Sequence, residues 1–236
     1  MKISVVTIVY NDFFGLKLSR QSVLEQRKQP YEHIVVDGNS QDDTLSPLTY
    51  FDKEPEIVIS EEDTGIYHAM NKGVKLASGD FVIFLNAGDT FFNNNFLQEL
   101  SSFKLDTNVI YFGNCFLIRP NQPGKITQPR KLIFFDSLPF NHQSCLTPTR
   151  YLKEHQFDEA LKILGDLKFY KKLFSDYVPF VHLNIVVAQY TMNGISSVPS
   201  LLYLKEVWML NREQSFFRKL FFSVKYVSKY IFYKVG

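Results

Sequence analysis

The chain has 236 residues, of which 45% are hydrophobic and 21% are charged, so it can bury a full core, which argues against disorder. The formal net charge is +2, which argues against a general nucleic-acid-binding protein. Two cysteines, Cys115 and Cys145, form neither a metal-binding spacing nor a disulfide framework, and a reducing cytoplasm is the simplest compartment.

Strand and helix patterns alternate through the first hundred residues, with short connections. Apolar and β-branched runs predict strands at 3–10, 56–60 and 80–85, and another that ends at Asp37. Helices are predicted from the Asn11-Asp12 cap to about Gln26, after SQDDT, and over 64–79, where apolar residues recur at helical spacing. This alternation predicts an α/β fold with a mostly parallel central sheet flanked by helices.

The regular alternation of strands and helices ends after a further predicted strand at 109–112. The Pro- and Gly-containing stretch at 119–125 predicts a hairpin or exposed loop, and shorter mixed elements follow to about residue 200. The N-terminal apolar run is too short to span a membrane, so it is interpreted as a first strand and not as a signal peptide.

The segment 215–236 contains no acidic residue and has a helical pattern. Its apolar stripe consists of Phe216, Leu220, Val224, Val227 and Ile231, and the basic residues Arg218, Lys225 and Lys229 fall on the opposite side. Basic charge with interfacial aromatics predicts a helix that lies on an anionic membrane surface. The alternative is an amphipathic helix packed on its own domain, because Phe222 and Phe232 intrude on the basic side.

Four polar clusters follow predicted strands: Tyr10-Asn11, 37–40, 61–63 and 86–89. In an open parallel sheet these strand ends face one crevice, where ligands bind. Neither a dinucleotide fingerprint nor a P-loop is present in the sequence. Carboxylates and amides can bind a base or ribose, and they can hold a divalent metal that neutralises a diphosphate. The pattern therefore fits a nucleotide-diphosphate ligand.

Five segments, in this order, resemble the family-2 glycosyltransferases with the GT-A fold: SVVTIVYND, HIVVDGNSQDDT, SEEDTGIYHAMNKGVKLASGDFVIFLNAGD, FNHQS and LGDLKFYKKL. The resemblance covers about residues 1–200 and is greatest to enzymes that build bacterial capsular, exopolysaccharide or lipopolysaccharide chains. It implies an inverting transferase that moves a sugar from a nucleotide-diphosphate donor, by default a UDP-sugar, to a saccharide or lipid-linked saccharide.

The resemblance also implies roles for individual residues. Asp166 matches the catalytic base, and His142 and Gln143 match a pair that lines the acceptor side. Asp89 is expected to serve a divalent Mn²⁺ or Mg²⁺ ion. The nucleotide sugar is expected to be bound by Tyr10, Asn11, Asp37, Asn39, Asp63, Asn71, Lys72 and Asn86. From the residues alone, Asp166 could instead be a helix N-cap, because it follows Gly165 and precedes a helix-like run.

The acidic motif departs from the pattern of the family. The family strand commonly ends Leu-Asp-x-Asp-Asp, whereas this one ends Leu85-Asn86-Ala87-Gly88-Asp89. Asn86 can still bond a ribose hydroxyl, but Gly88 cannot coordinate a metal through a side chain. Two alternatives therefore stay open, namely a transferase with weak metal dependence and a non-catalytic scaffolding descendant of the fold.

A sugar nucleotidyltransferase is a further alternative, but it would need an early phosphate loop rich in glycine and arginine, which TIVYNDFFG matches poorly. The expected organisation is a GT-A domain at 1–200, with a nucleotide-sugar-binding half at 1–113 and an acceptor-side half at 114–200. A helical, basic and aromatic extension at 201–236 follows. The expected location is cytoplasmic, with peripheral association to the inner face of the cell membrane through the C-terminal helix.

Overall fold

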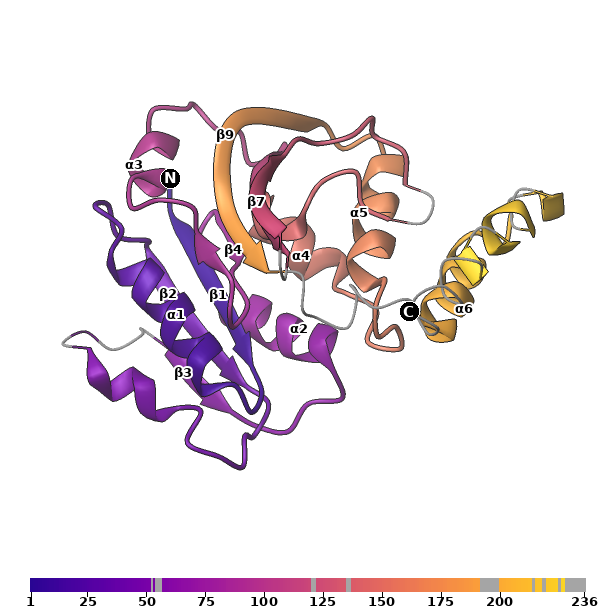
Figure 1. Ribbon diagram of the computed structural model, residues 1–236. Helices are drawn as coiled ribbons and strands as arrows, with labels where there is room; N and C mark the ends of the chain where they lie inside the picture. The colour runs from indigo at the N-terminus through magenta and orange to yellow at the C-terminus, as the bar shows by residue number, and fades with distance from the viewer. Residues whose placement is uncertain are drawn as a thin grey trace.

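The computed structural model describes residues 1–51, 53, 57–119, 122–134, 137–191, 200–213, 215–217, 220–224 and 226–227. Within them the strands form one sheet in the order β3-β2-β1-β4-β8-β6-β9-β5, and β7 pairs with β6. Figure 1 shows helices on both faces of this sheet, with α6 on the far side of α5 from the sheet.

The first four strands run parallel and form the half of the sheet predicted from the sequence. They are β1 (Ile3–Val9), β2 (Glu32–Asp37), β3 (Ile57–Ser60) and β4 (Phe81–Phe84). Every residue of β1, β2 and β4 is buried, which explains why these strands carry apolar residues without polar alternation.

The remaining strands are mixed in direction: β8 runs antiparallel to β4 and β6, while β9 runs parallel to β6. They are β5 (Thr90–Phe91), β6 (Ile110–Arg119), β7 (Gln122–Thr127), β8 (Cys145–Pro148) and β9 (Phe180–Thr191). The predicted hairpin at 119–125 is confirmed, since Arg119 of β6 pairs with Gln122 of β7. The expected division at 113/114 falls inside β6.

Three apolar clusters pack against the sheet, and the smallest consists of Val9, Leu16, Val35 and Leu48. Val6, Val36 and Phe84 pack with α2 and α5 on one face, and Val5 and Ile83 pack with α1 and α3 on the other. The α-helices are α1 (Phe13–Leu24), α2 (Ile66–Leu76), α3 (Phe96–Leu100), α4 (Thr149–His155), α5 (Gly165–Ser175) and α6 (Leu201–Leu210). Two 3₁₀ helices are η1 (Ser46–Tyr50) and η2 (His142–Ser144).

The helix predicted after SQDDT is the short 3₁₀ helix η1 instead of an α-helix. The Asp42 carboxylate accepts a hydrogen bond from the Thr44 amide at 3.0 Å, and this local turn competes with helix formation. Pro47 then occupies the first turn of η1. Both features favour a tight turn over a regular helix.

The segment after α6 folds back onto it. The Tyr203 and Tyr226 rings stack with centroids 5.0 Å apart, and Trp208 Nε1 donates to Ser223 Oγ at 2.6 Å. Residues 216–217, 220–224 and 226–227 are helical, whereas Arg218, Lys219, Lys225, Lys229, Ile231 and Lys234 of the predicted helix lie outside the described residues. None of the helices in the described ranges combines the length and apolar character needed to cross a membrane.

Candidate active site

The loops after β1 and β2 are tied together at the carboxyl edge of the sheet. The Gly38 amide donates to Val9 O at 3.0 Å, the Asn11 amide to Ser40 Oγ at 2.8 Å, and the Gln41 amide to Asn11 Oδ1 at 3.0 Å. Asn11 and Asn39 have positive φ angles of 47° and 64°, a conformation that asparagine tolerates better than most residues. These contacts give the predicted nucleotide loops a defined shape.

Asp37 ends β2 and is buried. Its carboxylate accepts hydrogen bonds from the Ser40 amide at 3.0 Å, from Ser60 Oγ at 2.6 Å and from Ser40 Oγ. A carboxylate has about four acceptor positions, so about one is left for a donor on a ligand. This remaining acceptor position is compatible with a hydrogen bond from a base N–H. That bond stays a prediction.

The side chains of Tyr10 and Asp63 both approach Gly38. A Cβ at position 38 would come within 2.6 Å of Asp63 Oδ2 and 3.2 Å of Tyr10 Cδ2, so both side chains approach the backbone there. Tyr10 is 61% exposed and Asp63 Oδ1 accepts from the Gly65 amide at 2.9 Å. An exposed aromatic ring beside Asp37 provides a surface on which a base can stack.

Two of the predicted nucleotide residues, Asn71 and Lys72, bind other parts of the protein. The Asn71 side chain bonds both backbone groups of Phe157 at 2.9 Å and donates to Glu159 at 2.9 Å. Lys72 Nζ donates to the carbonyl oxygens of Glu61 at 3.1 Å and Glu62 at 2.6 Å. The structure thus places Asn71 against the segment after α4 and Lys72 against the segment after β3.

The NAGD motif forms a tight turn at the end of β4. The Asp89 amide donates to Asn86 O at 2.9 Å, and Gly88 has a φ of +89°. A positive φ at the third residue is typical of a type II turn and favours glycine. The turn is held against α1, because Ser19 Oγ lies 2.9 Å from Asn86 O and 2.8 Å from Asp89 O. The backbone thus provides a physical reason for glycine at position 88.

Asp89 is buried beside the predicted acceptor pair. Burial raises the pKa of Asp89 to about 7, although the charge of His142 and a hydrogen bond from Gln143 oppose this rise. Within the described residues, the buried Oδ1 of Asn86 has no hydrogen-bond partner. The turn therefore carries one buried carboxylate, which accepts from Gln143, and one buried amide oxygen that has no hydrogen-bond partner among the described residues.

The FNHQS segment reaches this turn because β8 runs antiparallel to β4. Phe81 pairs with Pro148 and Val82 with Thr147, so the residues before β8 lie beyond the carboxyl end of β4. His142 lies there, in η2, and its Nδ1 is 3.1 Å from Asp166 Oδ2. Its Nε2 is buried and has no partner among the residues that the structure describes.

The charge state of His142 depends on the two carboxylates around it. Burial alone would lower the pKa of His142, but the hydrogen bond and charge of Asp166 and the charge of Asp89 outweigh this effect and raise the pKa. The site therefore combines an imidazole with two carboxyl groups that come from β4 and α5. Such groups are candidates for proton transfer.

Asp166 lies in the first turn of α5 and is not its N-cap. The N-cap residue is Leu164, which makes no side-chain capping bond. Asp166 Oδ1 accepts from the Leu167 amide at 2.7 Å and lies 3.2 Å from Tyr67 Oη, whose single proton it shares with Ile163 O at 2.8 Å. The N-cap alternative is therefore not supported, and Tyr67 is a site neighbour that the sequence reasoning missed. Its place within the GIYHAMNKG segment gave no sign of a contact 99 residues away.

The described residues hold no group of three or more His, Cys, Asp or Glu side chains that could bind a metal ion. Asp89 and Asn86 nevertheless offer two oxygen donors. Mg²⁺ is commonly bound through one or two carboxylates together with substrate phosphates. The donor set fits a metal shared with a diphosphate better than a metal held by the protein alone.

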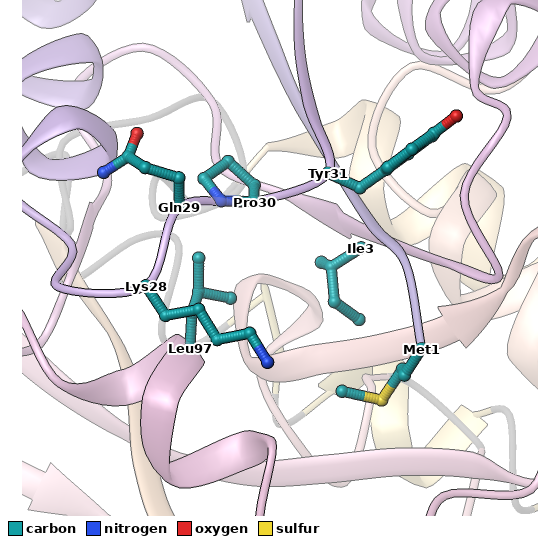
Figure 2. A pocket seen from close by; sticks show the side chains of 7 residues that line it. All are labelled: Met1, Ile3, Lys28, Gln29, Pro30, Tyr31 and Leu97. Carbon is teal, nitrogen blue, oxygen red and sulfur yellow. The ribbon is translucent and has the colours of Figure 1, made fainter.

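A small hollow lies at the opposite end of β1, and Figure 2 shows the side chains around it. It is lined by Met1, Ile3, Lys28, Gln29, Pro30, Tyr31 and Leu97. None of the acidic or histidine side chains described above lines it. The chemistry is therefore assigned to the carboxyl edge of the sheet and not to this hollow.

Relatives of known sequence point to one family. Glycosyl transferase family 2 matches residues 4–158, more than half of the chain. An uncharacterized glycosyltransferase of Mycobacterium tuberculosis is 43% identical over 90 residues, 38% of this chain and 34% of the relative. The UDP-Glc:alpha-D-GlcNAc-diphosphoundecaprenol beta-1,3-glucosyltransferase WfgD of Escherichia coli is 29% identical over 147 residues, 61% of this chain and 58% of the relative. The chain thus spans less than two thirds of the length of these relatives.

Solved structures agree on the fold. TarS 1–349 of S. aureus in complex with UDP-GlcNAc has a TM-score of 0.68 at 19% identity, covering 98% of this chain and 72% of that chain. The mannosyltransferase PcManGT from Pyrobaculum calidifontis, in complex with GDP-Man and Mn²⁺, has a TM-score of 0.60 at 18% identity, covering 87% and 59%. Together with the sequence match, these similarities show that the chain has the GT-A fold and belongs to Glycosyl transferase family 2.

Proposed function

We propose that the protein is an inverting glycosyltransferase that moves a sugar from a UDP-sugar to a lipid-linked saccharide during assembly of a surface polysaccharide. The observation that carries this proposal is that a nucleotide-type cluster, around Tyr10 and Asp37, and the His142–Asp166 pair both lie at the carboxyl edge of the sheet. The acceptor and the default donor follow the activity for which the E. coli relative is named.

The reaction is a single displacement in which Asp166 acts as the base. Asp166 takes the proton of an acceptor hydroxyl while that oxygen bonds to the anomeric carbon of the donor. The bond from this carbon to the diphosphate breaks, and its electron pair leaves with the nucleoside diphosphate. Attack opposite the leaving group inverts the configuration.

The surroundings of Asp166 support this role. The Leu167 amide and Tyr67 Oη fix Oδ1, and His142 fixes Oδ2. A carboxylate held from both oxygens is pre-oriented toward its substrate. The buried Nε2 of His142 is free, among the described residues, to bond a substrate oxygen.

Asp89 and Asn86 would hold a divalent metal together with the diphosphate. When bound, the metal would offset the negative charge that develops on the leaving group. Because these two side chains offer one carboxylate and one amide, we expect a metal that binds weakly without nucleotide.

We also propose that the C-terminal segment holds the protein at the cytoplasmic face of the membrane, where lipid-linked acceptors lie. Phe216, Phe217 and Phe221 are 60%, 80% and 75% exposed, and Leu220 and Val224 are exposed beside them. An exposed apolar patch of this kind, within a stretch that is basic in sequence, suits an anionic lipid surface.

The test is a transfer assay with purified protein, Mn²⁺ and a diphosphoundecaprenol-linked N-acetylglucosamine acceptor. UDP-glucose, UDP-N-acetylglucosamine and GDP-mannose are offered in parallel, and both glycolipid product and nucleoside diphosphate are measured. We expect product from one UDP-sugar, with β configuration if that donor is an α-linked sugar. Protein that binds nucleotide but releases no diphosphate from any donor would favour the scaffolding alternative.

A further inference from the structure

Helix α6 contributes a buried carboxylate to the loop that precedes α5. Glu206 is 3% exposed, and its two carboxylate oxygens accept hydrogen bonds from three consecutive backbone amides. Oε1 accepts from Lys162 at 2.8 Å, and Oε2 accepts from Ile163 at 3.1 Å and Leu164 at 2.9 Å. Glu206 lies outside the stretch that matches the family, 4–158.

These three amides belong to the turn that leads into α5, where Leu164 is the N-cap residue and Lys162 and Ile163 precede it. Buried backbone N–H groups need an acceptor, and the side chain of Leu164 provides none. Successive N–H groups form a site for an anion, and a buried carboxylate needs such charge-assisted bonds. Glu206 therefore supplies the acceptor for this turn, from a position more than forty residues away.

The same loop is held from the opposite side by the segment around α2. Tyr67 Oη donates to Ile163 O at 2.8 Å, and Lys162 Nζ donates to Thr64 O at 2.6 Å. The amides of the loop thus donate hydrogen bonds to Glu206 of α6. The hydrogen bonds of Ile163 O and Lys162 Nζ join the loop to the segment that carries the predicted nucleotide residues. Asp166 follows Leu164 by two residues, so its position depends on the contacts of the loop with α6 and with the segment around α2.

Helix α6 is itself fixed to α5. Val207 is 1% exposed and belongs to the core that contains Leu167 and Leu173. Lys171 Nζ donates to Leu210 O and to Asn211 Oδ1, both at 2.9 Å. Figure 1 shows α6 beside α5, on the side away from the sheet. The contact of Glu206 with the loop is therefore part of a packed interface.

We propose that Glu206 is a positioning residue for Asp166, so that α6 completes the catalytic side of the site. This inference rests on the proposed function, in which Asp166 is the base. Replacing Glu206 with glutamine leaves one acceptor oxygen for three amides and points an NH₂ group at a donor. The loop then shifts, and a misplacement of about 1 Å can lower a rate by about 100-fold.

Glu206→Gln is predicted to lower kcat and to leave the affinity for the nucleotide unchanged. Among the described residues, the hydrogen bonds of Glu206 go to the 162–164 amides and none goes to the nucleotide cluster at the ends of β1 and β2, so nucleotide affinity should be preserved. A residue that merely stabilised the fold would leave the kcat of the folded protein unchanged. Glu213→Gln is the matched control, because Glu213 is exposed just after α6 and loses the same charge.

The experiment measures three quantities on wild type, Glu206→Gln and Glu213→Gln: kcat at saturating donor, the Kd of UDP by calorimetry, and hydrogen exchange of the 160–167 amides. We expect Glu206→Gln to lower kcat by about 10- to 100-fold, to leave the Kd of UDP unchanged, and to speed exchange at 162–164. Glu213→Gln should match wild type in all three.

A wild-type kcat in folded Glu206→Gln, or unchanged exchange at 162–164, would overturn the inference. If Glu206→Gln does not fold, Glu206→Asp replaces it, because aspartate keeps the charge but withdraws the carboxylate by one methylene; a wild-type kcat there would also overturn it. The proposed function fails separately, through a wild type that turns over no donor, and the exchange measurement still decides whether Glu206 holds the loop.

Discussion

The central residue of the account is Asp166, whose two oxygens are held by different elements. Tyr67 reaches Oδ1 from α2, and His142 reaches Oδ2 from η2. The carboxylate is thus fixed where α2, η2 and α5 meet. This arrangement is more than a helix cap requires, because Leu164 and not Asp166 is the capping residue.

Replacing Asp166 with asparagine should lower kcat by about 10²- to 10⁴-fold, the usual loss when a general base is removed. The Kd of UDP should change little, because the nucleotide cluster is separate. Asp176→Asn, at the exposed C-terminal end of the same helix, is the control. Steady-state kinetics with isothermal titration check both values, and an Asp166→Asn enzyme with wild-type kcat would remove Asp166 from the mechanism.

Asp89 should make the stability of the metal-free protein depend on pH. Burial raises its pKa from the ordinary 3.8 to about 7, so the folded protein keeps a proton that the unfolded chain has lost. Stability should therefore fall as pH rises from about 4 to about 7, by on the order of a few kcal/mol. The raised pKa of His142 acts in the same direction. The folded protein holds this proton to a higher pH than the unfolded chain does, and the stability gained from it is lost as the pH rises.

Asp89→Asn removes this titration, so the Tm of the variant minus that of wild type should be larger at pH 8 than at pH 5. Thermal denaturation in the presence of a chelator measures the difference at both pH values. An equal difference at the two pH values would contradict the assignment of a raised pKa to Asp89.

At the scale of elements, the approach of α5 to α2 sets the contact between Tyr67 and Asp166. Gly165 lies against the Tyr67 ring, and a Cβ there would come within 2.7 Å of two ring carbons. Space at the start of α5 is thus limited by the aromatic ring that bonds the candidate base.

Gly165→Ala should destabilise the fold by about 1–3 kcal/mol through overpacking, and should also lower kcat, because the displaced ring moves away from Asp166. Gly73→Ala is the control: its Cβ would meet Val6 Cγ1 at 2.5 Å, in the core and away from Asp166. Both variants should lose stability in urea, but kcat should fall in Gly165→Ala alone. A parallel fall in both would show that overpacking, and not the Tyr67 contact, limits activity.

The C-terminal helical segment presents aromatic side chains to solvent. Its contacts to α6 use Ser223 and Tyr226, whereas Phe217 and Phe221 are exposed. The sequence pattern had placed Phe222 on the basic side, and the structure uses that residue for packing on the domain. The exposed side chains of Phe217 and Phe221 can therefore contact another surface.

Phe221→Ser should weaken binding to vesicles that contain anionic lipid, measured by co-sedimentation, because an exposed aromatic ring is lost from the patch. Tyr177→Ser is the control, since Tyr177 is 93% exposed at the end of α5. Binding of both variants at the wild-type level would contradict the membrane proposal.

The parallel half of the sheet could be predicted because three of its four strands, β1, β2 and β4, are buried on both faces and have no polar alternation. The mixed half could not, because β8 is inserted antiparallel between β4 and β6, and this pairing leaves no periodic signal. The family resemblance indicated His142 and Asp166, but the 3.1 Å distance between them depends on that insertion. Glu206 was missed because its partners are backbone amides, which any residue supplies.

At the scale of the whole molecule, the sheet brings the two halves of the proposed reaction to one edge. The ends of β1 and β2 carry Tyr10 and Asp37, and the end of β4 carries the turn with Asp89. The segment before β8 adds His142, and α5 adds Asp166. Helix α6 holds the loop before Asp166 from outside, so residues beyond the family match contribute to the site.

The carboxyl edge of the sheet is proposed to bind a nucleoside diphosphate together with a metal. The most direct measurement is a thermal-shift series with UDP, GDP, TDP and CMP, each with and without Mn²⁺, on wild type and Asp89→Ala. UDP at a hundred times its Kd should stabilise wild type by about 2.7 kcal/mol. The shift should be larger with Mn²⁺, and Asp89→Ala should lose that increment. Wild-type protein that shows no shift with any nucleotide would contradict the account and favour a scaffolding descendant of the fold.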